Sequence, residues 1–197
     1  MTTEFPTPEA IPMARISLDP PRTLLYRISE WYSRRTYGAV LDPVRAMAHN
    51  RKVMLTDARM EMSLAKWNTL DPRLKLLAVM ASSHLIGCSW CTDFGYWEAH
   101  NEGMPSAKLH AVPVWREHRT AFTELELDVL EYAEAMTETQ PTVTDELTAR
   151  LIERLGEPAF VELTAIVAVE NLRSRMNSAF GLTGQGFSDR CAVPSRG

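Results

Sequence analysis

A Cys-x-x-Cys pair lies between two helical patterns, and this arrangement constrains the fold more than any other feature of the chain. Asp71 followed by Pro72 is a typical helix start. The aspartate side chain can accept hydrogen bonds from the first free amides, and proline fits the first helical position because an amide there has no partner within the helix. Gly87 can end that helix, since glycine readily adopts the left-handed backbone of a C-terminal cap. Cys88 and Cys91 then fall at or near the start of the next helix, where free amides and the helix dipole favour a thiolate.

The same kinds of signal predict helices along most of the chain. Apolar residues recur at three- and four-residue steps, and glycine, proline or a capping residue ends each such segment. Thr123 and Glu126 match a capping box, and no run alternates with period two for long enough to predict a strand. We therefore predict an all-α protein. Its expected helices lie near residues 24–38, 42–50, 53–67, 71–87, 88–102, 107–112, 123–140, 144–155 and 158–180.

A chain of 197 residues is long enough for one domain with a sizeable core. Prolines cluster before residue 22 and little periodicity accompanies them, so we expect an extended N-terminal arm over residues 1–21. A single helical domain is predicted over residues 22–186, and a polar C-terminal tail over residues 187–197.

Charge and cysteine usage exclude several classes of protein. The net charge of -4 and the scattered Lys and Arg residues argue against nucleic-acid binding. No apolar run is long enough to cross a membrane and no secretory signal is evident, so we expect a soluble, cytoplasmic protein. Three cysteines, two of them only three positions apart, do not suit a secreted disulfide framework. Cys191 is expected to be an incidental surface thiol, with a resolving or intermolecular role as the alternative.

The motifs together resemble the carboxymuconolactone decarboxylase-like, AhpD-like family over roughly residues 40–185. The resemblance rests on the Asp-Pro helix start, the Gly-Cys-x-x-Cys motif, and a second helix that ends near Glu-Gly. It rests also on the lead-in LDPVRAMAHNRKVM and the closing segment VELTAIVAVENLRSRMNSAFGL. It implies an AhpD-like helical bundle and a homo-oligomer built from dimers or trimers. Redox-active members are thiol-dependent hydroperoxide reductases or partners that recycle peroxiredoxins, while others are lactone decarboxylases without the cysteine pair.

The family's redox pattern includes a glutamate twelve residues before the first cysteine and a histidine four after the second. Leu76 and Gly95 occupy those positions here, so the family's proton relay does not carry over. A thiol attacks as its thiolate, which a nearby base helps to form. Helical geometry offers His84, four residues before the first cysteine, and Glu98, seven after the second, as substitutes. The alternatives are a core histidine and a solvated helix residue.

We therefore predict that Cys88 and Cys91 cycle between dithiol and disulfide and act on a small hydroperoxide or a partner's disulfide. A thiol would serve as the electron donor, and no cofactor is expected. The resemblance implies that Cys91 attacks and Cys88 resolves, whereas the helix dipole alone favours Cys88. The rival interpretations are a redox-inactive scaffold or small-ligand binder, and a decarboxylase or isomerase that uses His84 with a carboxylate. Zinc binding is disfavoured because no second pair of suitably spaced ligands is present.

Further side chains near the pair are expected to have structural roles. Asp93 would stabilise the helix start through the dipole rather than take part in chemistry. Aromatic residues between and after the cysteines are predicted to pack as an apolar wall: Trp90, Phe94, Tyr96 and Trp97.

In the closing helix, Glu170, Arg173 and Asn177 share one face at steps of three and four. This pattern is typical of intrahelical pairing, with an internal polar network or an oligomer contact as the alternatives.

Overall fold

The computed structural model describes residues 14–191, and within this range the regular structure is entirely helical. The all-α prediction is confirmed. The helices are α1 Leu24–Tyr37, α2 Asp42–Met47, α3 Arg51–Leu64, α4 Pro72–Ile86, α5 Ser89–Asn101, α6 Ser106–Ala111, α7 Glu124–Thr137, α8 Asp145–Leu155 and α9 Glu157–Phe180, with 3-10 turns η1 Val112–Val114, η2 Arg119–Ala121 and η3 Ser188–Cys191.

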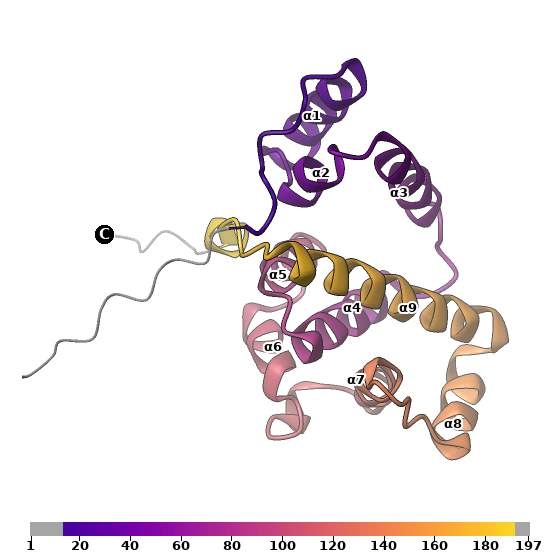
Figure 1. The fold of residues 1–197 in the computed structure, drawn as a ribbon. Helices are drawn as coiled ribbons and strands as arrows, with labels where there is room; N and C mark the ends of the chain where they lie inside the picture. Colours follow the sequence, from indigo (N-terminus) through magenta and orange to yellow (C-terminus); the bar gives the residue numbers. More distant parts are fainter. Residues whose placement is uncertain (1–13, 192–197) are drawn as a thin grey trace, which may run out of the picture.

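Figure 1 shows α1, α2 and α3 at one end of the molecule and α6, α7 and α8 at the other, with α4, α5 and α9 between them. Helix α4 packs against α5, α7 and α9, so it lies at the centre of the arrangement. The cysteine pair lies where this central helix is followed by α5: Cys88 is the N-cap residue of α5 and Cys91 is in its first turn. No helix among residues 14–191 combines the length and apolar character that crossing a membrane requires.

Helix boundaries follow the capping residues that the sequence displays. The Asp71 carboxylate accepts hydrogen bonds from the Arg73 and Leu74 amides, and the Thr123–Glu126 capping box forms in full. The second and third helices differ from expectation, because α2 ends at Met47 and α3 begins at Arg51. Asn50 explains the early start of α3, because its side chain accepts hydrogen bonds from the Lys52 and Val53 amides as the N-cap; α2 has already ended, with Ala48 as its C-cap.

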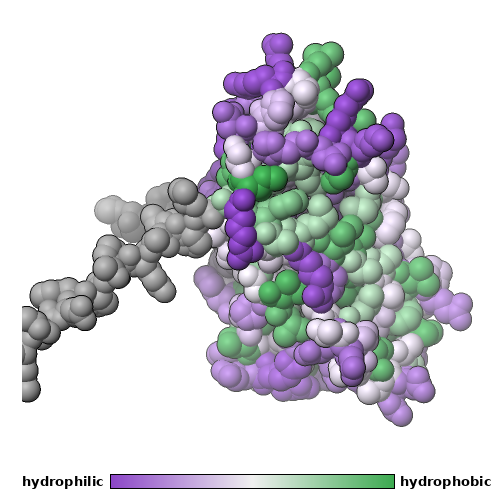
Figure 2. All heavy atoms as spheres, in the orientation of Figure 1, coloured by the Kyte–Doolittle hydropathy of each residue, from purple (hydrophilic) through white to green (hydrophobic). Residues whose placement is uncertain are grey.

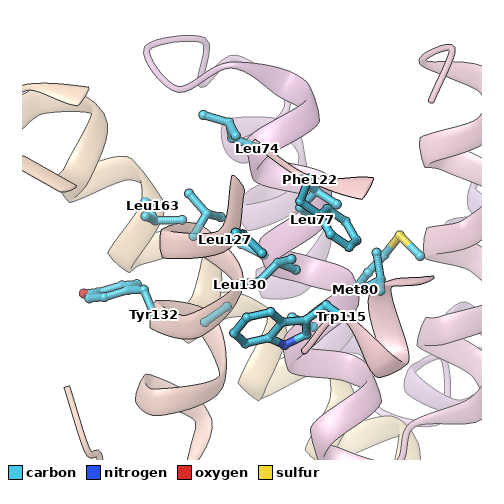
Figure 3. Close-up of a cluster of buried hydrophobic side chains, with 14 of the residues drawn as sticks. Leu74, Leu77, Met80, Trp115, Phe122, Leu127, Leu130, Tyr132 and Leu163 are labelled. Atoms are coloured by element: carbon cyan, nitrogen blue, oxygen red, sulfur yellow. The ribbon is translucent and has the colours of Figure 1, made fainter. Parts of the chain in front are cut away.

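The main hydrophobic core lies between α4, α7 and α9 and extends to α8 and the α6–η1 segment. Leu77 on α4, Leu130 on α7 and Leu163 on α9 are all completely buried. Figure 3 shows Leu77, Leu127 and Leu130 directed into the space between α4 and α7. Burying each such side chain contributes about 1.5–3 kcal/mol, so this core is the main source of stability.

Helices α1 to α3 have a much smaller apolar cluster, formed by Tyr26, Met47, Ala48 and Met54. The outer face of α1 leaves large apolar side chains exposed, among them Trp31 at 67%. Exposed apolar residues also occur on α9. Figure 2 shows hydrophobic residues, in green, across the middle of the face that it draws. The larger part of the apolar packing thus lies among α4, α7, α8 and α9 rather than among α1 to α3.

The predicted terminal segments are described only in part. Residues 1–13 of the predicted arm and 192–197 of the predicted tail lie outside the described residues. The described remainder of the arm runs along the body without helix until α1, and Pro20 in it is buried. In the region predicted as a polar tail, Phe187 is completely buried and η3 packs against α5, so these residues belong to the folded body.

Candidate active site

The cysteine pair occupies the junction that the sequence predicts. Gly87 adopts a left-handed conformation with φ of 78° and caps α4, and Cys88 is the N-cap residue of α5. The side chains of Cys88 and Cys91 form a disulfide whose Cα atoms are 5.3 Å apart. The glycine turn sets this geometry, because it reverses the chain in time to place the next residue at the start of a helix.

Each sulfur accepts one hydrogen bond. The Cys91 backbone amide donates to Cys88 Sγ over 3.2 Å, and Asn177 Nδ2 donates to Cys91 Sγ over 3.3 Å. Asn177 lies on α9 and is itself only 5% exposed. A donor aimed at sulfur stabilises a negative charge there more than a neutral thiol, so both positions suit a thiolate.

A cover of apolar side chains encloses the disulfide. Cys88 is 1% exposed and Cys91 is 6% exposed. The two pack with residues of four separate segments: Ala46, Trp90 and Leu182 in the buried cluster, with Ala14, Ile16, Leu18, Leu41, Phe94 and Phe180 around it. The pair is therefore shielded from solvent rather than displayed at the surface.

Arg15 fixes the N-terminal part of this cover over the end of α9. Its backbone amide donates to the Phe180 carbonyl over 2.7 Å, and its guanidinium donates to the Ser178 and Ala179 carbonyls. These carbonyls belong to the last turn of α9, which has no further helical turn to supply amide donors. The same residue thus caps α9 and holds the segment around Ile16 against the cysteine cluster.

Asp93 has a role that the sequence did not reveal. Its carboxylate accepts hydrogen bonds from the amides of Gln185, Phe187 and Ser188 and from the Ser188 hydroxyl, over 2.6–3.0 Å. Burial opposes its ionisation, but the hydrogen bonds outweigh burial and hold the pKa of Asp93 below its ordinary value. The carboxylate binds the loop after α9, in addition to any interaction with the helix dipole.

Gln185 connects that loop to the residue between the two cysteines. Its Oε1 accepts from Trp90 Nε1 over 2.8 Å and from the Asp42 amide over 2.9 Å, and its Nε2 donates to the Val40 carbonyl. One side chain therefore holds α5, the start of α2 and the C-terminal loop together beside the disulfide.

The predicted aromatic wall forms in part. Trp90 stacks on Phe94 with ring centroids 5.1 Å apart, and Trp97 packs against both Phe94 and Phe187. Tyr96 does not belong to this wall. It packs beside the main core and against His110 instead, because it points to the opposite side of α5.

Glu98, a predicted proton handler, lies among other acidic groups. It is half-buried on α5, and burial raises the pKa of Glu98 to about 7 against the lowering influence of Arg173. Glu170 and Glu61 add to the rise by charge repulsion. A carboxyl with a pKa near neutrality is suited to accept and release protons.

The predicted polar face of α9 forms an internal network. Glu170 is 2% exposed and accepts a 2.6 Å hydrogen bond from Ser174 Oγ. Arg173 donates to Glu61 of α3 over 2.8 Å and lies 3.5 Å from Glu170. The intrahelical pairing of Glu170 with Arg173 is thus present, and it is one part of a network that reaches Glu61 of α3. Asn177, on the same helix, donates to Cys91 Sγ instead.

The other sequence-predicted positions lie outside the immediate contacts of the sulfurs. His84 is exposed in the last turn of α4, and the structure shows no hydrogen bond between its ring and either sulfur. Leu76 packs against the main core. Gly95 is buried, and a Cβ placed there would lie 3.5 Å from Met80 Cγ of α4. Within residues 14–191, no three His, Cys, Asp or Glu side chains are grouped to hold a metal ion.

Together these features define an all-helical protein with a buried cysteine pair at the start of one helix. A model of the carboxymuconolactone decarboxylase family matches residues 52–135, a range that contains both cysteines. The uncharacterized protein YnjA of Escherichia coli (strain K12) is 33% identical over 174 residues, which cover 88% of this chain and 93% of YnjA. The chain belongs to the carboxymuconolactone decarboxylase family, as its sequence motifs predict.

Solved structures share the fold at lower identity. The debrominase Bmp8 in its apo form superposes with a TM-score of 0.74 at 18% identity, over 85% of this chain and 90% of Bmp8. An uncharacterized peroxidase-related protein from Silicibacter sp. TM1040 gives a TM-score of 0.79 at 12% identity, over 96% of this chain and 100% of that protein. These similarities concern the helical fold.

Proposed function

We propose that this protein is a thiol-dependent peroxidase or disulfide oxidoreductase in which Cys88 and Cys91 cycle between dithiol and disulfide. The observation that carries the proposal is the disulfide at the start of α5, with one hydrogen-bond donor directed at each sulfur. A redox cycle needs a stabilised thiolate and a second thiol within bonding distance, and this arrangement supports both. The family and fold include a decarboxylase and a debrominase, which supports catalysis in general terms.

Cys91 is proposed as the attacking thiolate and Cys88 as the resolving thiol. The Asn177 amide favours charge on Cys91, and Cys91 is the more exposed of the two, at 6% against 1%. Attack on a hydroperoxide would give a sulfenic acid, and attack on a partner's disulfide would give a mixed disulfide. Cys88 would then displace the new group and close the intramolecular disulfide.

The cover favours small substrates. Since both sulfurs are almost fully enclosed, a small hydroperoxide would reach Cys91 with less opening of the cover than a folded protein disulfide would. An external thiol is proposed as the electron donor.

The decisive experiment is peroxide consumption with a dithiol donor. We expect the natural protein to consume peroxide and Cys91→Ser to lose this activity, whereas Cys88→Ser should stop at a sulfenic acid that a trapping reagent detects by mass. Cys191→Ser is the matched control, because that thiol is the third cysteine and lies in η3. The proposal fails if mild peroxide produces no Cys88–Cys91 disulfide from the reduced protein.

His84 remains a prediction for the second proton handler beside Glu98. Its exposed ring could act only if the α4–α5 junction moved it toward Cys88. His84→Gln should then reduce the rate without changing the fold, and an unchanged rate would remove His84 from the mechanism.

The rival functions make different predictions. A redox-inactive scaffold or small-ligand binder would leave both cysteines unreactive toward peroxide. A decarboxylase or isomerase would instead turn over a carboxylic or lactone substrate and would retain that activity in Cys91→Ser.

The homo-oligomer is likewise a prediction, which the exposed apolar face of α1 supports through Leu24, Ile28, Trp31 and Tyr32. Light scattering of the natural protein and Trp31→Glu would measure the subunit number, and an oligomer through α1 should dissociate in the variant.

A further inference from the structure

A strap of chain before α1, residues 14–19, covers one side of the cysteine cluster. It contains no helix, and its apolar side chains are half-buried while its polar side chains are exposed. The apolar side chains pack against the cluster that contains both cysteines. The strap therefore lays one side on the cluster and turns the other to solvent. The alternation is Ala14, Ile16 and Leu18 against Arg15, Ser17 and Asp19.

Hydrogen bonds at two points hold the strap down. Arg15 donates from its backbone amide and its guanidinium to the carbonyls of residues 178–180, over 2.7–3.2 Å. Further along, His49 Nε2 donates to the Ser17 carbonyl over 2.8 Å. The bonds made by the two side chains are exposed to water, which competes for the same groups. Each of them therefore stabilises the closed strap only modestly.

Gly181 makes the close approach of Arg15 to the end of α9 possible. It caps the helix with φ of 70°, and a Cβ placed on it would lie 3.1 Å from Arg15 Cγ and 3.2 Å from the Arg15 backbone nitrogen. Contacts of that length are tighter than nearly all real Cβ contacts, so a side chain at this position would press on the strap. The end of α9 is thus shaped to receive the strap.

The rest of the cover is attached more firmly. Trp90 and Phe94 belong to α5 itself. The loop after α9 is held by four hydrogen bonds to Asp93 and by the contacts of Gln185, and Phe187 in it is completely buried. Segments with few buried contacts and exposed hydrogen bonds open more readily than the rest of a fold. Among the described residues, we therefore expect the strap to be the part of the cover that opens most easily.

Two prolines limit how far such an opening can spread. Pro20 is buried and Pro21 follows it, and each proline ring holds its backbone φ at about −65°. Thr23 then caps α1, because its side chain accepts a hydrogen bond from the Tyr26 amide. Lifting the strap should therefore bend the chain before Pro20 and leave α1 in place.

We propose that the strap is the gate through which reactants reach Cys91, and that Arg15 is the positioning residue that holds the gate closed. When the strap lifts, its three apolar side chains leave the cluster and open one side of the cover. The inference rests on the proposed function, in which a hydroperoxide and a thiol donor must both reach cysteines that are only 1% and 6% exposed. The size of the substrate is thus limited by an exposed residue whose hydrogen bonds go to α9 rather than to the cysteines.

Alkylation of the pre-reduced full chain tests the gate without requiring redox activity. N-ethylmaleimide is the small probe and a fluorescein maleimide the large one, each rate being divided by the rate with glutathione. Cys191→Ser is the background, so that the reaction reports Cys88 and Cys91. The large probe should react more slowly than the small one. Arg15→Ala should raise the rate of the large probe roughly 5- to 30-fold, and that of the small probe less, because the strap lifts more often.

A second variant and a matched control accompany Arg15→Ala. Ile16→Ser weakens the apolar contact of the strap and should act in the same direction; Ile16 is only half-buried, so the fold should survive. The control is Arg175→Ala, because Arg175 is also exposed and also donates to the last carbonyl of a helix, Thr137 of α7, outside the cysteine cluster. Its rates should stay within about 2-fold of the natural ones.

Urea distinguishes lifting of the strap from a general loss of stability. Below the unfolding transition, the rate of the large probe should rise only gently with urea, because lifting so short a segment exposes little surface. A rise as steep as that of global unfolding would mean that the whole fold opens, and the gate would be wrong. The gate is also wrong if Arg15→Ala and Ile16→Ser leave the rates unchanged, or if Arg175→Ala raises them equally.

Peroxide consumption then separates the gate from the redox function. We expect Arg15→Ala to raise kcat/KM for cumene hydroperoxide relative to kcat/KM for hydrogen peroxide, since the larger substrate needs the wider opening. An unchanged ratio would mean that the strap does not control substrate access. If the probes enter Arg15→Ala faster but neither protein consumes peroxide, the gate stands and the redox function is wrong.

Discussion

The two halves of α9 lie in contrasting surroundings, and each contains a buried glutamate. In the first half Glu162 accepts hydrogen bonds from the Thr69 amide and lies 2.6 Å from Lys75, so its pKa falls below the ordinary value even though burial opposes this. In the second half Glu170 shares Arg173 with Glu61, and burial raises the pKa of Glu170 to about 7. Burial alone does not decide the charge of a carboxyl; the supply of partners does. The first half of α9 thus holds a charged glutamate in a stabilising ion pair. The second half contains the glutamate with the raised pKa and also Asn177, which contacts Cys91.

The largest effect should come from removing core volume in the first half. Leu163→Ala deletes a completely buried side chain and should lower the free energy of unfolding by about 2–5 kcal/mol. Val161→Ala, two positions away and 64% exposed, should change it by less than about 0.5 kcal/mol. Urea unfolding of both variants provides the measurement, and equal losses would contradict the assignment of the main core.

The pH dependence of stability should distinguish the two glutamates. The pKa of Glu170 is about 7 in the folded protein against an ordinary 4.5, so the folded state binds this proton more tightly and stability falls as pH rises between these values. Glu162 has the opposite sign: its stabilisation is present above its unfolded pKa and is lost as pH falls through the lowered folded pKa. Glu170→Gln should therefore flatten the decline between pH 4.5 and 7, by about 1–3 kcal/mol.

Thermal unfolding across this pH range would show the flattening. Glu162→Gln should leave the decline in place and lower stability at neutral pH. An unchanged slope in Glu170→Gln would mean that Glu170 is charged in the folded protein at neutral pH.

The order of the loop that follows α9 should depend on the Asp93 carboxylate. Asp93→Ala leaves the amides of Gln185, Phe187 and Ser188 without their acceptor and should cost about 1–3 kcal/mol. Hydrogen exchange at these amides should accelerate, and a dithiol should reduce the disulfide faster because the cover opens more often. Asp189→Ala is the control, since Asp189 is exposed in the same loop region. Equal protection of these amides in both variants would argue against a role for Asp93 in holding this loop.

The smallest effect should come from the ion pair that joins α3 to α9. Glu61 is partly exposed, so Glu61→Gln should cost only about 0.2–1 kcal/mol, and less at high salt. Its sharper consequence should be a lower pKa for Glu98, because one repelling charge is removed. Infrared titration of the carboxyls would measure this shift. Arg22→Gln, which removes the ion pair between the residue just before the N-cap of α1 and Glu30 on α1, is the control variant.

The sequence predicts the helices well because their boundaries are set locally. Asp71, Gly87 and Thr123 each act on amides or carbonyls within a few residues, so their effect can be inferred without the rest of the fold. The placement of Cys88 at a helix start follows from the same local rule.

The partners of the cysteines depend on distant contacts and could not be predicted in the same way. Asn177 lies 86 residues from Cys91 along the chain, and its hydrogen bond exists only because α5 and α9 pack together. The sequence does show that Glu170 and Asn177 are polar residues on one face of an otherwise apolar helix. That spacing does not reveal which other helix packs against this face. Tyr96 was misplaced for a related reason, since α5 is covered on both sides and the pattern does not say which side each aromatic residue faces.

The cover over the disulfide also has a consequence for biosynthesis. The cysteines leave the ribosome well before Phe180, Leu182 and Gln185, which complete their enclosure. During synthesis the two thiols are therefore open to small oxidants and reductants for longer than at any time in the finished protein. We therefore expect the redox poise around the nascent chain to set the first oxidation state of the cysteine pair, and the apolar cover of the folded protein to limit later exchange.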